Sequence, residues 1–385
     1  MRTVAKDAAS TLFKPQTLGS LQLANRIVMS PMTRSFAPGG VPGEDIAEYY
    51  RRRAGADVGL IITEGVWVDH AGASNDDNVP RFYGEDALAG WARVVKRVHE
   101  AGGKIMPQLW HVGLFSGAYD SAGETNPKPE RLEREKRQVG PSGMIGGQGR
   151  APVPTGEPMS LAEIESVIDA FASGAQAARR LGFDGIALHG AHGYLLDQFL
   201  WAATNLRADS YGGDRSQRTR FVAEMIAEIR RRTSPDFPIM LRYSQWKLQD
   251  YGAGLATTPG ELDELLTPLV DAGVDIIDCS QRRFWEPVFE GSDLNLAGWT
   301  KKLTGKPTVT VGSVGLDQEM FATFAGATGA PASLDRLIGL LDRGDFDLVA
   351  VGRALLVDPD WATKVKEGRH DAALPFTPDA LGRLN

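Results

Sequence analysis

The sequence predicts an eight-stranded (β/α)8 barrel, a TIM barrel, with an N-terminal hairpin and a long insertion after the third strand. Three observations support this fold class. Short apolar runs alternate with helical patterns along the 385 residues. Several runs are apolar at consecutive positions, as in Gly59-Leu60-Ile61-Ile62, which is typical of parallel strands covered on both faces. Helical patterns follow nearly all eight runs, and this repetition favours a closed barrel over an open doubly wound sheet.

The individual elements follow from the apolar runs and from helical periodicity. The expected strands are Arg26–Ser30, Gly59–Thr63, Lys104–Leu109, Gly185–Leu188, Pro238–Arg242, Val274–Cys279, Pro307–Val311 and Asp347–Val351. The expected helices include Glu44–Ala54, Glu85–Ala101, Leu161–Leu181, Ser216–Arg232, Gly260–Ala272 and Ala332–Leu341. Ser160 with Glu163, and Thr258 with Glu261, have the spacing of capping boxes and predict the starts of two of these helices.

Two segments interrupt the regular alternation. Leu12–Asn25, with Leu18-Gly19-Ser20 at its centre, is interpreted as a hairpin that closes the bottom of the barrel. His111–Met159 is a segment of about fifty residues rich in Gly, Pro and charge, and a loop of this length is usually functional. We expect residues 113–159, approximately, to cover a pocket as a lid, with a solvated insertion as the alternative. No repeat or linker divides the chain, so residues 1–385 are interpreted as one domain.

Composition excludes several classes of function. The net charge is −7 and there is no basic run, so no nucleic-acid partner is expected. No apolar segment is long enough to span a bilayer, and Met1–Lys14 lacks the apolar core of a signal peptide. The single cysteine, Cys279, cannot form an internal disulfide or ligate an iron–sulfur cluster or a structural zinc. A cytoplasmic protein is therefore expected, either a monomer or a homo-oligomer.

Barrel enzymes carry their chemistry at the carboxyl ends of the strands, so the residues there form the candidate site. In strand order the residues there are Pro31, Met32, Thr33, Glu64, Gly65, Gln108, Trp110, His111, His189, His192, Tyr194, Arg242, Tyr243, Ser244, Cys279, Ser280, Gly312, Ser313, Val314, Gly315, Gly352 and Arg353. Small residues after strands seven and eight suit a phosphate site, because backbone N–H groups must approach the oxygens closely. Arg353 can add a bidentate contact to the same phosphate. Ordinary turn glycines are the alternative for Gly312 and Gly352.

Two imidazoles and a phenol leave the fourth strand within six residues, at His189, His192 and Tyr194. Such groups can hold a carbonyl or phenolate oxygen and donate a proton to a neighbouring carbon. Two alternatives stay open. The two histidines could bind zinc together with His70 or His111, and Tyr194 could be packed in the core.

Other residues near the strand ends have less specific surroundings. Arg242 follows the apolar lead-in Pro238-Ile239-Met240-Leu241, which favours the barrel mouth over a surface salt bridge. Cys279 is interpreted as a packed small residue rather than a nucleophile. The aromatic residues Trp246 and Phe284-Trp285 could belong either to the core or to a pocket wall.

Several motifs, in order along residues 12–361, resemble the Old Yellow Enzyme family. They are Leu12-Phe13-Lys14-Pro15, Asn25 to Arg34, Glu48-Tyr49-Tyr50, Gln108 to Gly113, His189 to Leu200, Asn205 to Gly213, Gly312 to Gly315, Gly352-Arg353 and Asp358-Pro359 with Trp361. The resemblance implies an FMN-dependent (β/α)8 barrel that reduces activated alkenes with NAD(P)H. FMN would be bound non-covalently, and the reaction would follow a ping-pong mechanism.

The resemblance also assigns roles to the residues at the strand ends. For the flavin ring they would be Pro31, Met32 and Thr33 against the isoalloxazine, Gly65 and Gln108 at its polar edge, and Arg242 near N1 and the C2 oxygen. For the phosphate they would be Gly312, Ser313, Gly352 and Arg353. For the substrate they would be His189 and His192 at its activating oxygen, Tyr194 as proton donor, and Trp110 as a pocket wall. The implied substrates are enones, enals and nitroalkenes.

The sequence departs from the usual family pattern at several positions. Strand five ends in Arg242-Tyr243-Ser244-Gln245-Trp246 where Arg-x-Ser-Pro is more usual, which indicates an altered pocket and an unusual substrate. Asp214 to Arg218 replaces the usual Ser-x-Glu-Asn-Arg, which puts the start of the following helix in question. Thr33 stands where one branch has a cysteine. The alternatives are an oxidative demethylase or dehydrogenase of the same fold, a metal-dependent barrel hydrolase, and a non-catalytic flavin-binding protein.

Overall fold

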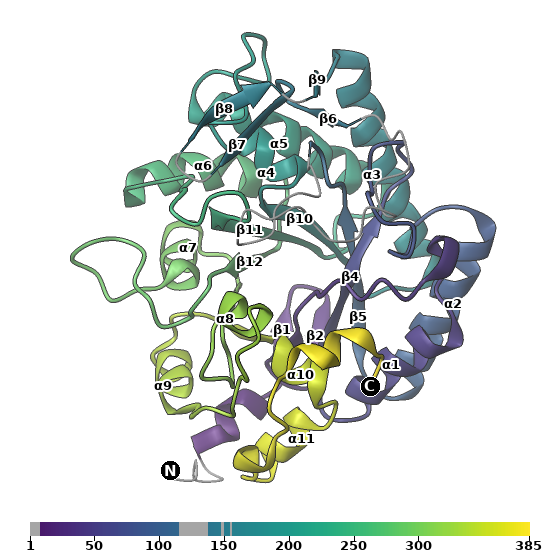
Figure 1. Ribbon diagram of the computed structural model, residues 1–385, viewed down its shortest axis with the longest axis vertical. Helices are drawn as coiled ribbons and strands as arrows, with labels where there is room; N and C mark the ends of the chain where they lie inside the picture. The colour runs from purple at the N-terminus through teal and green to yellow at the C-terminus, as the bar shows by residue number, and fades with distance from the viewer. Residues whose placement is uncertain (1–7, 115–137, 148–149, 155) are drawn as a thin grey trace.

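A closed barrel of eight parallel strands forms the centre of the computed structural model, which describes residues 8–114, 138–147, 150–154 and 156–385 (Figure 1). The strands, in order around the barrel, are β3 (Ile27–Met29), β4 (Leu60–Trp67), β5 (Lys104–Trp110), β10 (Ile186–His192), β11 (Ile239–Lys247), β12 (Ile276–Ser280), β13 (Thr308–Val311) and β14 (Leu348–Val351). All the predicted strands are confirmed. Strands β4, β10 and β11 extend several residues beyond the predicted carboxyl ends.

Helices surround the barrel. The longer ones are α1 (Glu44–Ala54), α2 (Glu85–Glu100), α3 (Leu161–Leu181), α5 (Arg215–Arg232), α6 (Pro259–Asp271), α7 (Leu296–Thr304) and α9 (Asp335–Arg343). Short helices near the strand ends are α4 (Leu195–Leu200), α8 (Met320–Phe324), α10 (Arg353–Val357) and α11 (Trp361–Lys366). The 3-10 helices are η1 (Ala8–Phe13), η2 (Pro38–Gly40), η4 (His370–Ala372) and η5 (Pro378–Gly382).

Side-chain caps begin three of the long helices, α3, α5 and α6. The capping box of Ser160 and Glu163 is confirmed, and Thr258 caps α6 by accepting from the Glu261 N–H. Asp214 and Gln217 form a further capping box, so the unusual sequence there still begins α5. The predicted start of α9 at Ala332 is wrong by three residues, because the Ala332 N–H bonds to the carbonyl of Gly315 and holds the chain extended.

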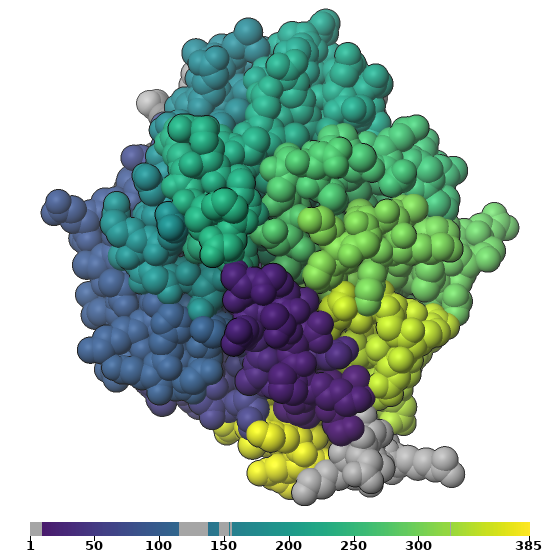
Figure 2. All heavy atoms as spheres, turned by 180° about the vertical axis from the view of Figure 1, so that it is seen from behind, coloured from purple at the N-terminus to yellow at the C-terminus, as the bar shows by residue number. Residues whose placement is uncertain are grey.

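The predicted hairpin is confirmed as β1 (Gln16–Leu18) and β2 (Leu21–Leu23), which pair antiparallel. Its leucines Leu18, Leu21 and Leu23 are buried and belong to one apolar cluster with the side chains inside the barrel. That cluster includes Val28, Leu60, Ile62, Met106, Ala187, Met240, Ile276, Val309, Leu348 and Ala350. From behind, the purple N-terminal segment lies between the blue part of the chain and its yellow C-terminal part (Figure 2). The hairpin therefore closes the amino-terminal end of the barrel and leaves the carboxyl end for a site.

The insertion after β5 contains two small sheets in its described part. Strand β6 (Val139–Gly140) pairs parallel with β9 (Glu157–Pro158), and β7 (Met144–Gly147) pairs antiparallel with β8 (Arg150–Pro154). The predicted lid covers residues 113–159, of which 115–137, 148–149 and 155 lie outside the described residues, so the lid stays a prediction. No helix in the described part of the chain is long and apolar enough to cross a membrane.

The hairpin plug leads to a prediction about stability. Leu21→Ala should lower the free energy of unfolding by about 2–5 kcal/mol, because it leaves a cavity in the apolar cluster at the barrel base. Gln22→Ala, at the exposed neighbouring position, should change it by less than about 0.5 kcal/mol. Equilibrium urea unfolding of both variants provides the measurement. Equal, small losses would show that the hairpin does not contribute to the core.

Candidate active site

A cavity of about 360 Å³ lies at the carboxyl ends of the barrel strands. Most of the strand-end residues line it: Pro31, Met32, Thr33, Gly65, Gln108, Trp110, His189, His192, Tyr194, Arg242, Ser280, Gly312, Ser313, Val314, Gly352 and Arg353. Glu64, His111, Tyr243, Ser244, Cys279 and Gly315 do not line it. The parallel barrel brings the lining residues together because its strand ends all meet at one rim. Their individual roles stay predictions.

The cavity also has walls that sequence reasoning missed. They are Ser30, Leu248, Gln281, Arg282, Val311, Leu316, Met320, Ala350 and Leu381. Several directly follow or end predicted strands and could have been found from that position. Leu381 could not, because it lies in the C-terminal segment, about thirty residues along the sequence from the last barrel strand. Trp246 also lines the cavity, whereas Phe284 is buried in the core, which answers the question left open for these aromatic residues.

Arg242 is fixed by a buried ion pair. Its Nε donates to Asp278 Oδ2 at 2.7 Å and its Nη2 donates to Ser30 Oγ at 2.9 Å. Both charged side chains are almost completely buried, so the interpretation of Arg242 as a surface salt bridge is wrong. Burial raises the pKa of Asp278, and the adjacent guanidinium opposes that shift. The pairing holds a permanent positive charge at one position in the cavity wall.

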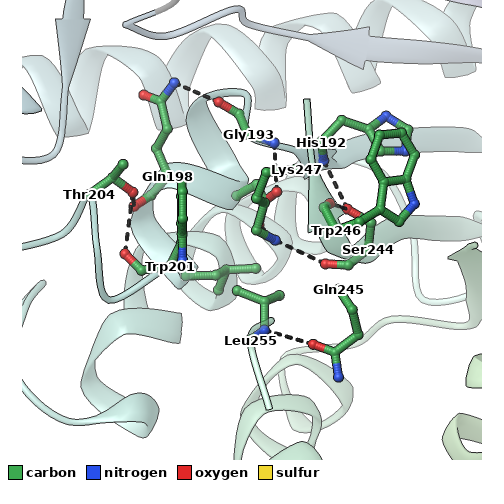
Figure 3. Close-up of polar contacts among 12 residues, drawn as sticks. His192, Gly193, Gln198, Trp201, Thr204, Ser244, Gln245, Trp246, Lys247 and Leu255 are labelled. Carbon is green, nitrogen blue, oxygen red and sulfur yellow. Dashed lines mark hydrogen bonds and ion pairs between the residues drawn. The ribbon is translucent and has the colours of Figure 1, made fainter. Parts of the chain in front are cut away.

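His189, His192 and Tyr194 form a compact aromatic group. The ring of His189 lies 5.2 Å from that of His192 and 4.9 Å from that of Tyr194, centroid to centroid. Trp110 packs edge-on against Tyr194 at 5.0 Å. His192 stacks on Trp246 at 4.4 Å (Figure 3). Its Nε2 shares a hydrogen bond of 2.7 Å with Ser280 Oγ. Tyr194 is thus packed against aromatic rings and also lines the cavity.

Burial determines the protonation of this group. It lowers the pKa of His189 to about 3, and the charge of Arg242 adds to the shift. Burial likewise lowers the pKa of His192 well below its usual value, with His189 contributing. The same desolvation raises the pKa of the Tyr194 phenol. At neutral pH the cavity therefore contains two neutral imidazoles, each with one N–H donor, and a protonated phenol.

The other two histidines form a separate pair. His111 Nε2 lies 2.9 Å from His70 Nδ1, and His111 Nδ1 accepts the N–H of Gly113. Neither ring lines the cavity. Within the described ranges, no three His, Cys, Asp or Glu side chains are grouped so that they could hold a metal ion. The histidine arrangement needed for a zinc hydrolase is therefore not assembled.

Of the two strand-end glycines predicted to bind phosphate, Gly312 after β13 is closely packed and Gly352 after β14 makes only ordinary contacts, so the phosphate role stays a prediction. Gly312 has φ +137°, and a Cβ there would lie 2.5 Å from the Gln281 carbonyl oxygen, so the turn requires glycine. Ser313 adopts a left-handed φ of +52°. The guanidinium of Arg353 donates to the carbonyl of Gln318 at 2.8 Å and to Thr323 Oγ1 at 2.8 Å. Arg353 thus also braces the loop before α8, a role that its sequence context did not reveal.

The fold and the cavity are accompanied by clear similarity to known proteins. A family model described as NADH:flavin oxidoreductase / NADH oxidase matches residues 11–372. The chain belongs to this family. This membership confirms the resemblance to Old Yellow Enzymes.

Individual relatives give the degree of similarity. The chain is 34% identical over 370 residues to an NADH oxidase of Thermoanaerobacter brockii, which covers 94% of this chain and 51% of that protein. It is 38% identical over 221 residues to 12-oxophytodienoate reductase 7 of Oryza sativa subsp. japonica, covering 57% and 54% of the two chains. The chain spans about half the length of these curated relatives. Morphinone reductase in complex with tetrahydroNAD superposes with a TM-score of 0.75 at 27% identity, covering 96% of this chain and 93% of that one.

The depressed pKa of His189 predicts a pH dependence of stability. Below about pH 6.5 the unfolded chain binds a proton on His189 that the folded chain, with a pKa of about 3, does not bind. The free energy of unfolding should therefore fall as the pH drops from 6.5 towards 3, by about 1.4 kcal/mol per pH unit from this residue. Urea unfolding between pH 7 and 4.5 measures the slope. His189→Asn should reduce that slope by close to 1.4 kcal/mol per pH unit, the contribution of one proton. An unchanged slope would show that the pKa of His189 is not depressed in the folded protein.

Proposed function

We propose that this protein is an FMN-dependent ene-reductase, which uses NAD(P)H to reduce C=C bonds activated by a carbonyl or nitro group. The single observation that carries this proposal is the shared cavity of Arg242, the neutral His189–His192 pair and Tyr194. It combines a fixed positive charge, two neutral hydrogen-bond donors and a protonated phenol within one barrel mouth. The names of the relatives, which include two reductases, agree with this activity.

The residues of the cavity fit a flavin mononucleotide. Gln108 Nε2 and His189 Nδ1 are buried at the cavity without a hydrogen-bond partner among the described residues, which leaves both atoms available to a ligand or to water. Pro31, Met32 and Thr33 would lie against the ring system, with Gly65 and Gln108 at its polar edge. Gly312, Ser313, Gly352 and Arg353 would hold the phosphate. When bound, FMN would supply the chemistry of accepting a hydride from NAD(P)H and returning it to carbon.

Arg242 would stabilise negative charge at the polar edge of the flavin ring. Because Asp278 and Ser30 hold its guanidinium in place, little reorganisation is needed when that charge develops. Gln108 would donate to the same edge through its buried amide.

His189 and His192 would hold the activating oxygen of the substrate. Since burial keeps both imidazoles neutral, each can donate one N–H to an oxygen without the cost of burying a second positive charge beside Arg242. Ser280, which shares a hydrogen bond with His192 Nε2, would determine which nitrogen of that ring carries the proton.

Tyr194 would transfer its phenolic proton to the substrate carbon next to the activating group. Its raised pKa keeps the proton on the oxygen at neutral pH, which a general acid requires. Trp110 and Trp246 would exclude water on either side of this group, since one packs on Tyr194 and the other on His192.

The cofactor proposal predicts that the purified protein carries flavin and that Arg353→Ala weakens its retention, because a charged phosphate contact is lost. Chromatography of the flavin released on denaturation should yield FMN. The control is Thr323→Val, which removes a loop contact of the same guanidinium but leaves its charge. If Thr323→Val releases flavin as readily as Arg353→Ala, or if the released flavin is FAD, the phosphate assignment is wrong.

If Tyr194 is the acid, Tyr194→Phe should affect the rates of the two half-reactions differently. Reduction of the flavin by NAD(P)H should change little, because it takes no proton from the phenol. Oxidation by an enone should slow by about 10²–10⁴-fold, the usual contribution of a positioned acid. Stopped-flow absorbance follows each half-reaction separately. Equal slowing of both would indicate that Tyr194 is only structural, and unchanged enone turnover would assign the proton to another donor.

A further inference from the structure

A completely buried ion pair lies directly behind the His192–Tyr194 turn. Lys247 at the end of β11 donates from Nζ to Asp197 Oδ1 on α4 at 2.7 Å, and both side chains have no exposed surface (Figure 3). Neither residue lines the cavity. A buried ion pair usually adds little stability compared with apolar residues of the same volume, and a specific geometry is a recognised reason to retain one.

The ion pair is bonded directly to the turn that carries the proposed substrate-binding side chains. Asp197 Oδ2, the oxygen not used by Lys247, accepts the backbone N–H of Gly193 at 2.7 Å. Lys247 Nζ also donates to the carbonyl of Ser244 at 3.0 Å. Ser244 Oγ in turn accepts the backbone N–H of His192 at 3.0 Å. The Asp197 carboxylate thus binds the Gly193 N–H directly, whereas the Lys247 ammonium is linked to the His192 N–H only through Ser244 (Figure 3).

The turn itself needs this support. His192 has a left-handed φ of +67° and Gly193 one of +86°. A left-handed histidine is uncommon and persists only where the surrounding structure holds it. The carbonyl of Gly193 accepts from Gln198 Nε2 at 2.8 Å and from Gln249 Nε2 at 3.1 Å, so the turn is held from both sides. The ring of His192 and the phenol of Tyr194 leave this turn towards the cavity.

We propose that the Lys247–Asp197 ion pair is a positioning element for substrate reduction, which holds the His192–Tyr194 turn so that the imidazole and the phenol meet the substrate. This inference rests on the proposed function. The carboxylate suits the task because its two oxygens accept from Gly193 and Lys247 in fixed directions, and the ammonium links the turn to the end of β11. Lys247 directly follows the unusual strand ending Arg242 to Trp246, which is thereby connected to the placement of the turn.

The test uses the flavin-loaded protein and the double variant Asp197→Asn/Lys247→Met, which removes both charges and leaves no unpaired ion in the interior. A misplacement of about 1 Å can cost about 10²-fold in rate, so oxidation of the reduced enzyme by an enone should slow by about 10- to 100-fold. Reduction by NAD(P)H should stay within about twofold of wild type. Titration of the oxidised protein with a phenol, followed by its charge-transfer absorbance, should give a Kd raised about tenfold, and this readout does not depend on turnover.

The matched control is Lys301→Met, which breaks the Lys301–Asp347 ion pair at the amino-terminal end of the barrel. It should change neither half-reaction nor phenol binding. If the double variant keeps wild-type enone oxidation and phenol affinity, or if it slows both half-reactions equally, the proposal is overturned. If the double variant does not fold, Asp197→Asn alone, which preserves the shape of the side chain, must slow enone oxidation while leaving reduction by NAD(P)H nearly unchanged. If neither variant folds with FMN while Lys301→Met does, the pair contributes only to stability and the proposal is again overturned.

Failure of the proposed function can be recognised separately. Tyr194→Phe with an unchanged rate of enone oxidation would remove Tyr194 as the acid whatever the ion pair does. If Tyr194→Phe shows the expected loss and the double variant does not, only the positioning inference fails.

Discussion

Closure of the barrel between its last and first strands is the constraint on which the site depends. Strand β14 pairs parallel with β3, with Val349 opposite Ile27 and Val351 opposite Met29. This pairing brings the residues after the first strand against those after the last. A Cβ on Gly352 would lie 3.6 Å from the sulfur of Met32, although these residues come from opposite ends of the chain. Without closure, the ring-binding and phosphate-binding residues of the proposed flavin site would line no common cavity.

Desolvation at the barrel mouth then sets the electrostatics. Two pairs of charged groups are buried there, Arg242 with Asp278 and Lys247 with Asp197. His189, whose Nδ1 has no hydrogen-bond partner among the described residues, is instead held neutral by burial. The result is a fixed positive charge at Arg242 beside neutral donors. That combination suits a planar polar ring and a substrate oxygen better than it suits a cation or a metal ion.

Much of the candidate site could be predicted from the sequence because its residues occupy equivalent positions in repeated units. Gln108, Arg242 and Gly312 each end or directly follow an apolar run, and parallel strands in a barrel present such positions to one rim. The prediction was weaker for helix boundaries, as at α9, where the hydrogen bond from Ala332 to Gly315 overrides a helical pattern. Leu381 could not be predicted as part of the cavity wall, because no sequence pattern around this C-terminal residue indicates that it packs there.

The sequence by itself determined the barrel, its N-terminal plug and the set of side chains at the strand ends, since periodicity and apolar runs are local properties. Only the tertiary structure decided how those side chains are partnered. The pairing of His70 with His111, the stacking of Trp246 on His192 and the ion pair of Lys247 with Asp197 all join residues distant in sequence. Such contacts, and the neutral state of His189, depend on burial and on short distances that exist only when the barrel is closed. The sequence pattern of a single helix or strand therefore cannot predict them.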